Sequence, residues 1–261
     1  MEFPELGFGT WQIEGRECEE AVRDALEVGY RHIDTAWIYE NEQHVGRGLK
    51  AIDRGEVWLT TKVWMDDAEP ERVRASCERS LQLLDTDYLD LLLHHWPNPD
   101  VPVERTVEAL TALREEGKVR EIGLSNAPPG LLLRALDAGP VFTNQVEYHP
   151  FLGQERLLEV CAEHDLTLTA YSPLAQGKAA DDPTLQEIGE AHGKSAGQVA
   201  IRWLMEQPRV ITIPKASTHE RRVENFDVFD FELSHDERAR IDALPKDQRE
   251  SSPSFAPDWD S

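Results

Sequence analysis

Residues 57–95 read VWLTTKVWMDDAEPERVRASCERSLQLLDTDYLDLLLHH, and their pattern indicates the class of fold. The segment opens with a β-rich apolar run (57–63) and closes with another (88–95). Between them, residues 71–84 carry Val, Cys and Leu at intervals of three and four, which is the spacing of an amphipathic helix. A strand, a helix and a second strand in this order predict one parallel βαβ unit.

The same rhythm covers most of the chain. Short β-rich runs occur at residues 6–11, 30–36, 57–63, 88–95, 119–125, 142–147, 166–171 and 210–213. Segments with helical spacing alternate with them, at residues 16–28, 42–54, 71–84, 103–116, 129–138, 154–164, 183–207 (broken near Gly193) and 218–228. Eight such units in 261 residues match the usual size of a (β/α)8 TIM barrel, about 250 residues. We therefore expect one α/β barrel domain, residues 1–261, with an extra helix at 233–244 and an irregular tail at 245–261.

An open, doubly wound sheet is the alternative arrangement of the same elements. Its dinucleotide-binding form carries G-x-G-x-x-G after the first strand. Here G-F-G at residues 7–9 is followed by T-W-Q, so the third glycine is missing. The pattern therefore favours the closed barrel.

The charge balance argues against two classes of partner. The chain has 50 Asp and Glu against 27 Lys and Arg, a formal charge of −23. An acidic surface repels phosphates, so we expect neither nucleic acid nor an anionic membrane as a partner. Only seven of the basic residues are lysines. An acidic, lysine-poor surface indicates a halophilic protein that is soluble in concentrated salt, where the repulsion is screened; an ordinary acidic cytosolic enzyme is the alternative.

Nothing in the chain indicates export or membrane insertion. It has no run of 18 apolar residues, and its N-terminal residues MEFPE lack the basic and apolar regions of a signal peptide. Its three cysteines stand singly in helix-like segments and are predicted to be buried apolar residues. We expect a cytoplasmic protein, and a monomer.

Polar residues stand at the ends of three successive strands, where the chemistry of a barrel is located. The second strand ends near Asp34 and its loop carries Tyr39, Lys62 ends the third strand, and His94 and His95 end the fourth. Each of these residues alone is compatible with ordinary packing or capping. Together they indicate a catalytic group.

The motifs around these residues resemble those of the aldo-keto reductase family. They are D-T-A-W-I-Y-E-N-E (34–42), T-K-V-W (61–64) and L-H-H-W-P (93–97). Further matches are G-x-G-T-W (7–11), L-S-N (124–126), N-Q-V-E-Y-H-P (144–150), A-Y-S-P-L (170–174) and I-P-K-A-S-T-x-E-R-x-x-E-N (213–225). Eight matches in one order over the whole barrel make the resemblance specific. It is strongest to the small microbial members of the 2,5-diketo-D-gluconate reductase type.

The resemblance implies reduction of an aldehyde or small ketone to an alcohol by hydride transfer from NAD(P)H. Tyr39 would be the general acid for the developing alkoxide. Lys62 would lower the pKa of the phenol, because a neighbouring ammonium favours the phenolate, and Asp34 would hold Lys62 in place. His95, as a neutral donor, would orient the substrate oxygen. The family pattern places this histidine directly before Trp-Pro, which leaves His94 as a residue that packs or that supports the site without touching the substrate.

The resemblance also implies where the nicotinamide lies. Tyr171 would stack on it, with Ser125, Asn126 and Gln145 around its carboxamide. Other residues implied in cofactor binding are Gly9, Thr10, Ser172, Pro173, Leu174, Ile213, Thr218, Glu224 and Asn225.

The loop after the eighth strand bears on the choice of cofactor. Lys215 and Arg221 are two cations that would suit a 2′-phosphate, so NADPH is favoured. Many family members carry a hydroxyl residue directly after the lysine, whereas this chain has Ala216, with Ser217 next. NADH is therefore also possible.

Aromatic and apolar residues beside the catalytic motifs would rim the substrate pocket, namely Trp11, Ile38, Trp64 and Trp96. Such walls suit aldehydes and small ketones. The tail motif F-A-P-D-W (255–259) is expected to fold back and close part of the mouth.

Two other functions are compatible with parts of the sequence. A metal-dependent barrel hydrolase could use His32, Asp34, His94, His95 and His149 as ligands. That function leaves Tyr39 and Lys62 unexplained, so we expect no metal. A barrel that binds the cofactor without catalysis, as a regulatory module, is the other alternative.

Overall fold

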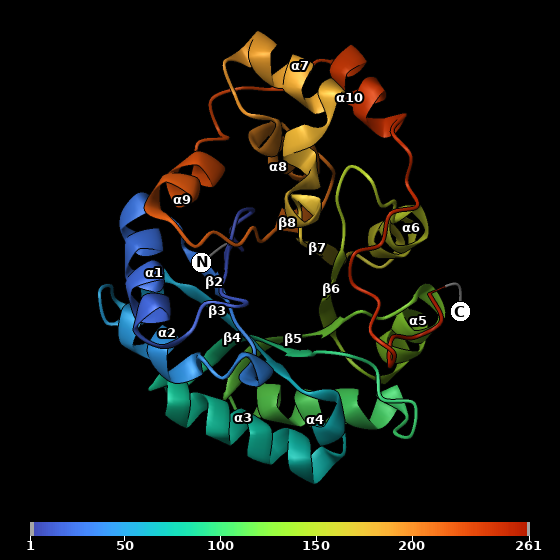
Figure 1. The fold of residues 1–261 in the computed structure, drawn as a ribbon. Coiled ribbons are helices and arrows are strands. Elements are labelled where there is room, and N and C mark those ends of the chain that lie inside the picture. Colours follow the sequence, from blue (N-terminus) through green and yellow to red (C-terminus); the bar gives the residue numbers. More distant parts are fainter. Residues whose placement is uncertain (1–2, 260–261) are drawn as a thin grey trace.

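The computed structural model describes residues 3–259, which form a single (β/α)8 barrel, as predicted (Figure 1). Eight parallel strands follow one another around the sheet in chain order. They are β1 (Phe8–Gly9), β2 (His32–Asp34), β3 (Trp58–Val63), β4 (Leu89–His94), β5 (Val119–Ser125), β6 (Val141–Glu147), β7 (Thr167–Tyr171) and β8 (Val210–Thr212). The strands are buried almost throughout, which explains their near-continuous apolar runs.

Contacts between the first and last strands close the ring. The Gly7 N–H donates to Thr212 O at 2.8 Å, the Thr212 N–H donates to Glu5 O at 3.0 Å, and the Gly9 N–H donates to Pro214 O at 3.1 Å. These contacts are isolated bridges and do not form a continuous ladder. The strand β1 is therefore much shorter than the predicted run at 6–11. Closure removes the free edges that an open sheet would leave.

Helices surround the barrel on its outer face (Figure 1). They are α1 (Gly15–Val28), α2 (Glu42–Leu49), α3 (Pro70–Leu84), α4 (Val103–Glu115), α5 (Pro129–Ala138), α6 (Glu155–Glu163), α7 (Pro183–His192), α8 (Ala196–Met205), α9 (His219–Phe226) and α10 (His235–Asp242). The predicted break at Gly193 separates α7 from α8: Gly193 adopts φ = +65°, where glycine is favoured, and Ser195 begins α8 with a capping box. The predicted helix at 42–54 ends earlier, at Leu49, and a 3₁₀ turn follows at Arg54–Glu56.

An aromatic cluster fills the end of the barrel where the strands begin. The Phe3 ring lies 4.6 Å from that of Trp58 and 5.2 Å from that of Phe142, measured between centroids. His32 contacts Phe3 from the same end, at 4.8 Å. Because this end is packed, the opposite end, where the strands finish, is the one that can hold a ligand.

The tail runs from α10 past α6 toward α5 (Figure 1). It begins with a bridge between Leu152 and Asp247, and the Gln248 N–H donates to Phe151 O at 2.9 Å. Residues 260–261 of the predicted tail lie outside the described residues. Within residues 3–259, no helix combines the length and apolar character needed to cross a membrane.

Candidate functional site

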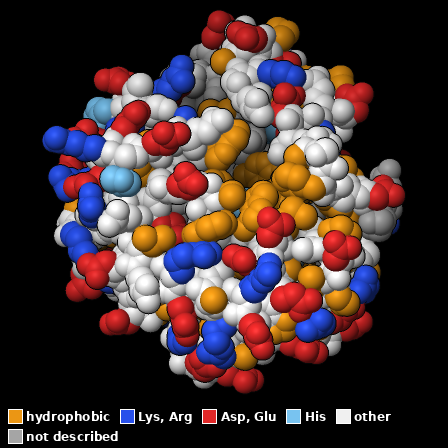
Figure 2. Space-filling view, turned by 60° about the horizontal axis from the view of Figure 1, so that its bottom comes forward, with side chains coloured by type: hydrophobic (Ala, Val, Ile, Leu, Met, Phe, Trp, Pro, Cys, Tyr) orange, Lys and Arg blue, Asp and Glu red, His pale blue; other side chains and the backbone are white. Residues whose placement is uncertain are grey.

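A cavity of about 750 Å³ opens at the carboxyl ends of the strands. Such a volume is typical of a site for a small molecule. On the face shown in Figure 2, hydrophobic side chains border a hollow and carboxylates surround it. The cavity brings together many residues that the sequence singled out: Gly9, Trp11, Asp34, Ile38, Tyr39, Trp64, His95, Trp96, Ser125, Asn126, Gln145, Tyr171, Ser172, Ile213 and Lys215.

Lys62 and Asp34 form a buried ion pair; Asp34 lines this cavity, whereas Lys62, which was predicted to be catalytic, does not. Lys62 Nζ donates to Asp34 Oδ1 at 2.5 Å and to Thr35 O at 2.8 Å. The two residues come from neighbouring parallel strands, whose ends meet at one rim. The other oxygen of the carboxylate, Asp34 Oδ2, accepts from Gln145 Nε2 at 2.8 Å. Hydrogen bonds therefore compensate both buried charges, which burial of an ion pair requires.

Tyr39 lies above this pair because a 3₁₀ turn, Trp37–Tyr39, directly follows β2. Its ring centroid is 5.2 Å from Lys62 Nζ and 5.7 Å from the ring of His95, which meets it edge to face. The phenol, the amine and the imidazole are thus grouped at one mouth of the barrel.

Asn41 holds the loop that carries Tyr39, a role that the sequence analysis missed. Its Nδ2 donates to Thr10 O at 2.9 Å and to Ile13 O at 3.0 Å, and its Oδ1 accepts from Thr35 Oγ1 at 2.7 Å. The position belongs to the quoted motif at 34–42, but its partners lie outside that motif. The motif alone therefore could not reveal the role.

The predicted lowering of the Tyr39 pKa is wrong for this structure. Burial raises the pKa of Tyr39 well above its usual value, and the negative charge of Asp34 acts in the same direction. Because the Lys62 ammonium is paired with Asp34, the phenol faces little net charge, and loss of hydration dominates. Burial also lowers the pKa of Lys62, with Asp34 opposing that shift. Tyr39 is consequently a neutral phenol, which is the form that can donate a proton.

The two histidines at the end of β4 occupy different environments. His95 lines the cavity, and its ring lies 5.3 Å from that of Trp64. His94, which precedes it, is not among the residues that line the cavity, in keeping with the alternation of strand side chains. Burial lowers the pKa of His95 well below its usual value, and it lowers that of His94 to about 4. Both imidazoles are therefore neutral at physiological pH.

The residues expected around the nicotinamide form one hydrogen-bonded network. Asn126 adopts φ = +60° after β5, a conformation that asparagine tolerates. Its Nδ2 donates to His95 O and to Ser125 Oγ, both at 3.0 Å, and its Oδ1 accepts from the Tyr171 hydroxyl at 2.8 Å. Ser125 Oγ donates to Gln145 O at 2.9 Å. The network joins β5, β6 and β7 along one wall of the cavity.

Of the other residues expected to bind the cofactor, including those for its phosphates and adenine, only some line the cavity. Lys215 lines the cavity, and its Nζ donates to Ser217 Oγ at 2.9 Å. Thr218 caps α9, and Arg221 is exposed on that helix. The expected cofactor-binding residues that do not line the cavity are Thr10, Pro173, Leu174, Thr218, Arg221, Glu224 and Asn225. Thr10 is buried and donates to Asp34 O at 3.1 Å.

Arg222 shapes the loop after β8, although the sequence analysis gave it no role. Its Nη1 donates to Ala216 O at 3.1 Å and to Ser217 O at 3.0 Å, and its Nε donates to Asp24 Oδ2 at 2.5 Å. A buried arginine thus fixes the backbone beside Lys215.

Aromatic rings form the outer wall of the cavity. Trp11 is 46% exposed and Ile38 is 37% exposed, so both present apolar surface to a ligand. The Phe255 ring, from the tail, meets those of Trp64 and Trp96 edge to face at 5.6 and 5.4 Å. The tail therefore supplies part of this wall.

The metal-ligand set considered above is not assembled. Among residues 3–259, no three His, Cys, Asp or Glu side chains are grouped so that they could hold a metal ion. His32 lies at the packed end of the barrel, and its Nε2 is 3.0 Å from Thr60 Oγ1. His149 pairs with Glu147 at 3.0 Å.

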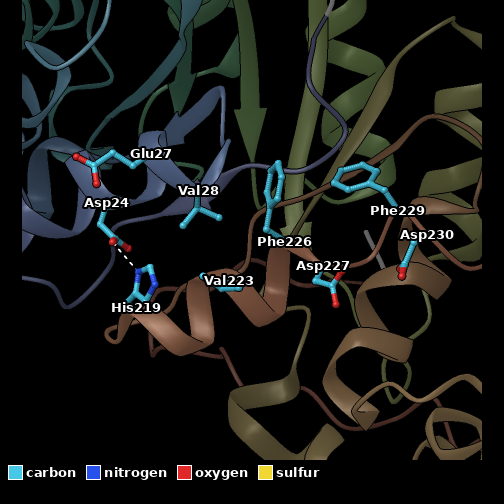
Figure 3. A pocket seen from close by; sticks show the side chains of 9 residues that line it. All are labelled: Asp24, Glu27, Val28, His219, Val223, Phe226, Asp227, Phe229 and Asp230. Carbon is cyan, nitrogen blue, oxygen red and sulfur yellow. Dashed lines mark hydrogen bonds and ion pairs between the residues drawn. The ribbon is translucent and has the colours of Figure 1, made fainter.

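A second hollow, of about 650 Å³, lies between α1 and α9 (Figure 3). Val28, Val223 and Phe226 contribute its apolar surface. Asp24, at its edge, is bonded to His219 at 2.7 Å. None of the predicted catalytic residues lines this hollow, whereas Asp34, Tyr39 and His95 line the cavity at the strand ends.

Comparison with known proteins agrees with this geometry. The model of the Aldo/keto reductase family matches residues 5–246. The chain is 45% identical over 257 residues to the 9,11-endoperoxide prostaglandin H2 reductase of Trypanosoma cruzi (strain CL Brener), covering 95% of this chain and 90% of that protein. It is 44% identical over 254 residues to the glyoxal reductase of Bacillus subtilis (strain 168), covering 95% and 91% of the two chains.

Solved structures show the same likeness. A protein assigned as a 2,5-diketo-D-gluconic acid reductase B superposes with a TM-score of 0.96 at 44% identity, covering 99% of this chain and 94% of that one. The aldose reductase from Schistosoma japonicum gives a TM-score of 0.92 at 34% identity, covering 98% and 93%. The resemblance drawn from the motifs is confirmed.

Proposed function

Because this chain belongs to the aldo/keto reductase family, we propose that it reduces aldehydes or small ketones to alcohols, with NAD(P)H as the hydride donor. One observation carries the proposal. Tyr39, Asp34 and His95 line the same cavity, and Lys62, from the end of β3, is bonded to Asp34 and lies 5.2 Å from the centroid of the Tyr39 ring.

The residues at the cavity fit a nicotinamide cofactor. Tyr171 offers a flat ring, Asn126 and Gln145 offer amides, and Lys215 offers a cation, all at the wall of one cavity. A bound reduced nicotinamide supplies the hydride. In the proposed arrangement Tyr171 packs against the nicotinamide ring, and the amide-bearing wall of β5 and β6 faces its carboxamide.

The residues of the catalytic group then act on the carbonyl oxygen. His95, neutral because it is buried, donates a hydrogen bond that orients this oxygen. Tyr39, a neutral phenol, donates its proton as negative charge develops there. Lys62 stabilises the phenolate that remains; Asp34 holds Lys62 in position, and Gln145 donates a hydrogen bond to Asp34. Trp64 and Trp96 exclude water from the reacting oxygen.

NADPH is the preferred cofactor in this proposal. Lys215 lines the cavity, and Arg221 is exposed on the next helix, where each can reach a phosphate. Ala216 cannot donate a hydrogen bond from its side chain, but Ser217 lies beside the Lys215 ammonium and can replace that contact. NADH is the second cofactor that the site can accept.

Steady-state NADPH oxidation with a panel of aldehydes and ketones tests the proposal. We expect wild-type turnover, and in Tyr39→Phe a loss of kcat of about 10²–10⁴-fold. Tyr88→Phe, which removes a hydroxyl bonded to Arg54 O far from the cavity, is the matched control and should keep kcat. Near-full kcat in Tyr39→Phe would show that the proton comes from elsewhere. Wild-type protein that binds NADPH but turns over no carbonyl would support the non-catalytic, cofactor-binding role.

We also infer that the protein works as a cytoplasmic monomer in concentrated salt. The charge of −23 repels itself in dilute buffer, and molar salt shortens the Debye length to about 3 Å. Circular dichroism and activity measured from low to molar salt should both increase with salt, and sedimentation should give a mass near 29.7 kDa. Unchanged spectra and activity over that range would contradict the salt dependence.

A further inference from the structure

Glu147, at the end of β6, is a buried carboxylate with no part in the proposed chemistry. It is completely inaccessible to solvent and is absent from the cavity lining. Its Oε1 accepts from the Glu250 N–H at 2.7 Å and lies 3.0 Å from His149 Nε2. Its Oε2 accepts from the Ser251 N–H at 2.8 Å. Two of its partners are therefore backbone groups of the tail.

His149 strengthens this arrangement from the barrel side. The His149 Nδ1 accepts from the Phe151 N–H at 3.2 Å, so a neutral His149 carries its proton on Nε2 and donates it to Glu147. Gln154 Nε2 donates to Glu147 O at 2.7 Å and fixes the backbone of the same residue. Although burial by itself raises the pKa of Glu147, these hydrogen bonds hold it below its usual value. The group is thus an anion, and its bonds to backbone N–H groups are charge-assisted and strong.

The tail segment held by Glu147 continues directly into the aromatic wall. Residues 250–253 and Phe255 line the cavity. Phe255 meets Trp64 and Trp96, and Trp96 also lies 6.0 Å from the ring of Trp259. The segment has no helix or strand of its own between residues 248 and 259, so its position depends on such attachments.

A second contact that holds the tail, an ion pair, is weaker than the hydrogen bonds to Glu147. Lys178, in the loop after β7, pairs with Glu250 at 2.5 Å, but the lysine side chain is 53% exposed. Exposed ion pairs contribute little to stability, whereas buried, charge-assisted bonds contribute more. The buried carboxylate is therefore the stronger of the two.

We propose that Glu147 is a positioning residue: its buried carboxylate fastens the tail across the mouth of the barrel, so that Phe255 completes the wall against which the carbonyl substrate packs. The inference rests on the proposed function for the identity of the ligand. Glu147 touches no reacting atom, so it acts on substrate binding through the tail. Its loss should raise KM for the carbonyl substrate while kcat and the Kd for NADPH stay close to wild type.

Glu147→Gln is the direct test because it keeps the shape of the side chain. It replaces one acceptor oxygen with an NH2 group, which cannot accept a bond from the tail. We expect KM for the carbonyl substrate to rise about tenfold, with kcat and the NADPH Kd within about twofold of wild type. Hydrogen exchange measured by mass spectrometry on the unliganded protein should become at least about tenfold faster in peptides covering residues 247–259, and remain unchanged in the barrel strands.

Asp90→Asn is the matched control. Asp90 is also a buried carboxylate, and its Oδ2 accepts from the Leu59 N–H at 3.0 Å, but it lies near the start of β4, at the packed end of the barrel. This variant should lose stability without changing KM or exchange in the tail. Equal changes of KM and tail exchange in both variants would show a general structural effect and overturn the proposal.

Phe255→Ala provides a second variant that leaves the Glu147 contacts intact. If Glu147 acts through the tail, Glu147→Gln should add less than about twofold to the KM of Phe255→Ala. Independent, multiplying effects would overturn the proposal. The hydrogen-exchange measurement requires no turnover, so the two ideas can fail separately. Wild-type protein that reduces no carbonyl would contradict the proposed function but not this inference. Unchanged hydrogen exchange of the tail in Glu147→Gln would contradict this inference but not the proposed function.

Discussion

Asp34→Asn should destabilise the protein strongly at neutral pH and weakly at high pH. The wild-type carboxylate accepts from Lys62 Nζ at 2.5 Å and from Gln145 Nε2 at 2.8 Å. Asp34 is 2% exposed and Lys62 is 1% exposed. An asparagine leaves the Lys62 ammonium without its counter-ion and cannot accept with both side-chain atoms. Breaking a buried pair in this way typically costs about 3–5 kcal/mol.

The lysine can limit this cost by losing its proton. Burial already lowers the pKa of Lys62, and the charge and hydrogen bond of Asp34 oppose that shift, so removing Asp34 lowers the pKa further. In the unfolded chain lysine titrates near its usual 10.5, and each pH unit below that value adds about 1.4 kcal/mol to the cost of folding with a neutral amine. The ceiling on the destabilisation is therefore about 5 kcal/mol at pH 7 and about 1.4 kcal/mol at pH 9.5. The sign follows from linkage: the unfolded variant binds the additional proton, so its stability rises with pH.

Urea unfolding followed by tryptophan fluorescence at pH 7 and pH 9.5 measures this difference for wild type and variant. At pH 7 the melting temperature should fall by about 10 °C. Glu116→Gln is the control, because it breaks the exposed Arg74–Glu116 pair and should change stability little at either pH. A loss of stability in Asp34→Asn that is as large at pH 9.5 as at pH 7 would refute the reasoning, as would no loss at pH 7.

Three further predictions concern activity. Replacing His95 with Gln should lower kcat/KM by about 10²-fold or more, whereas His94→Gln should lower it far less, since His94 does not line the cavity. Steady-state kinetics of the two variants measures this difference, and equal losses of kcat/KM would contradict the assignment of His95. Lys215→Ala should raise KM for NADPH about tenfold and that for NADH much less, and an equal change for both cofactors would mean that Lys215 does not bind a 2′-phosphate. Glu40 lines the cavity, so its negative charge should disfavour negatively charged substrates. Glu40→Gln should therefore raise kcat/KM for 4-carboxybenzaldehyde about two- to fivefold and leave kcat/KM for benzaldehyde unchanged. Parallel changes for both aldehydes would argue against selection by charge.

Much of the fold could be predicted because its pattern is local. The run at 57–63 became β3 (Trp58–Val63) and the spacing at 71–84 became α3 (Pro70–Leu84), since period and turn signals act over a few residues. The run at 6–11 forms only the two-residue strand β1, because it pairs with β2 at two positions and contacts the last strand, some two hundred residues away, through isolated bridges alone.

The candidate site divides in the same way. Asp34, Tyr39, Lys62 and His95 could be proposed from motifs, because the residue types and their places at strand ends are visible in the chain. The contact between Gln145 and Asp34 was not found, because it crosses the barrel between β6 and β2. The motif at 144–150 includes Glu147, and a glutamate inside an apolar strand is a signal for a special role, but its partners in the tail cannot be read from that motif.

The order of residues along the chain was sufficient to indicate a barrel, to identify the family and to name the chemical groups of the site, since these depend on short-range spacing and residue type. The tertiary structure decided the direction in which the pKa of Tyr39 shifts, because that direction depends on how much water is excluded and on how completely Asp34 balances Lys62. It also decided where the tail lies, because Glu147 and Ser251 become neighbours only after β6 and the C-terminal segment have packed together. Hydration and long-range contacts are properties of the folded molecule, so they cannot be predicted from a local sequence pattern.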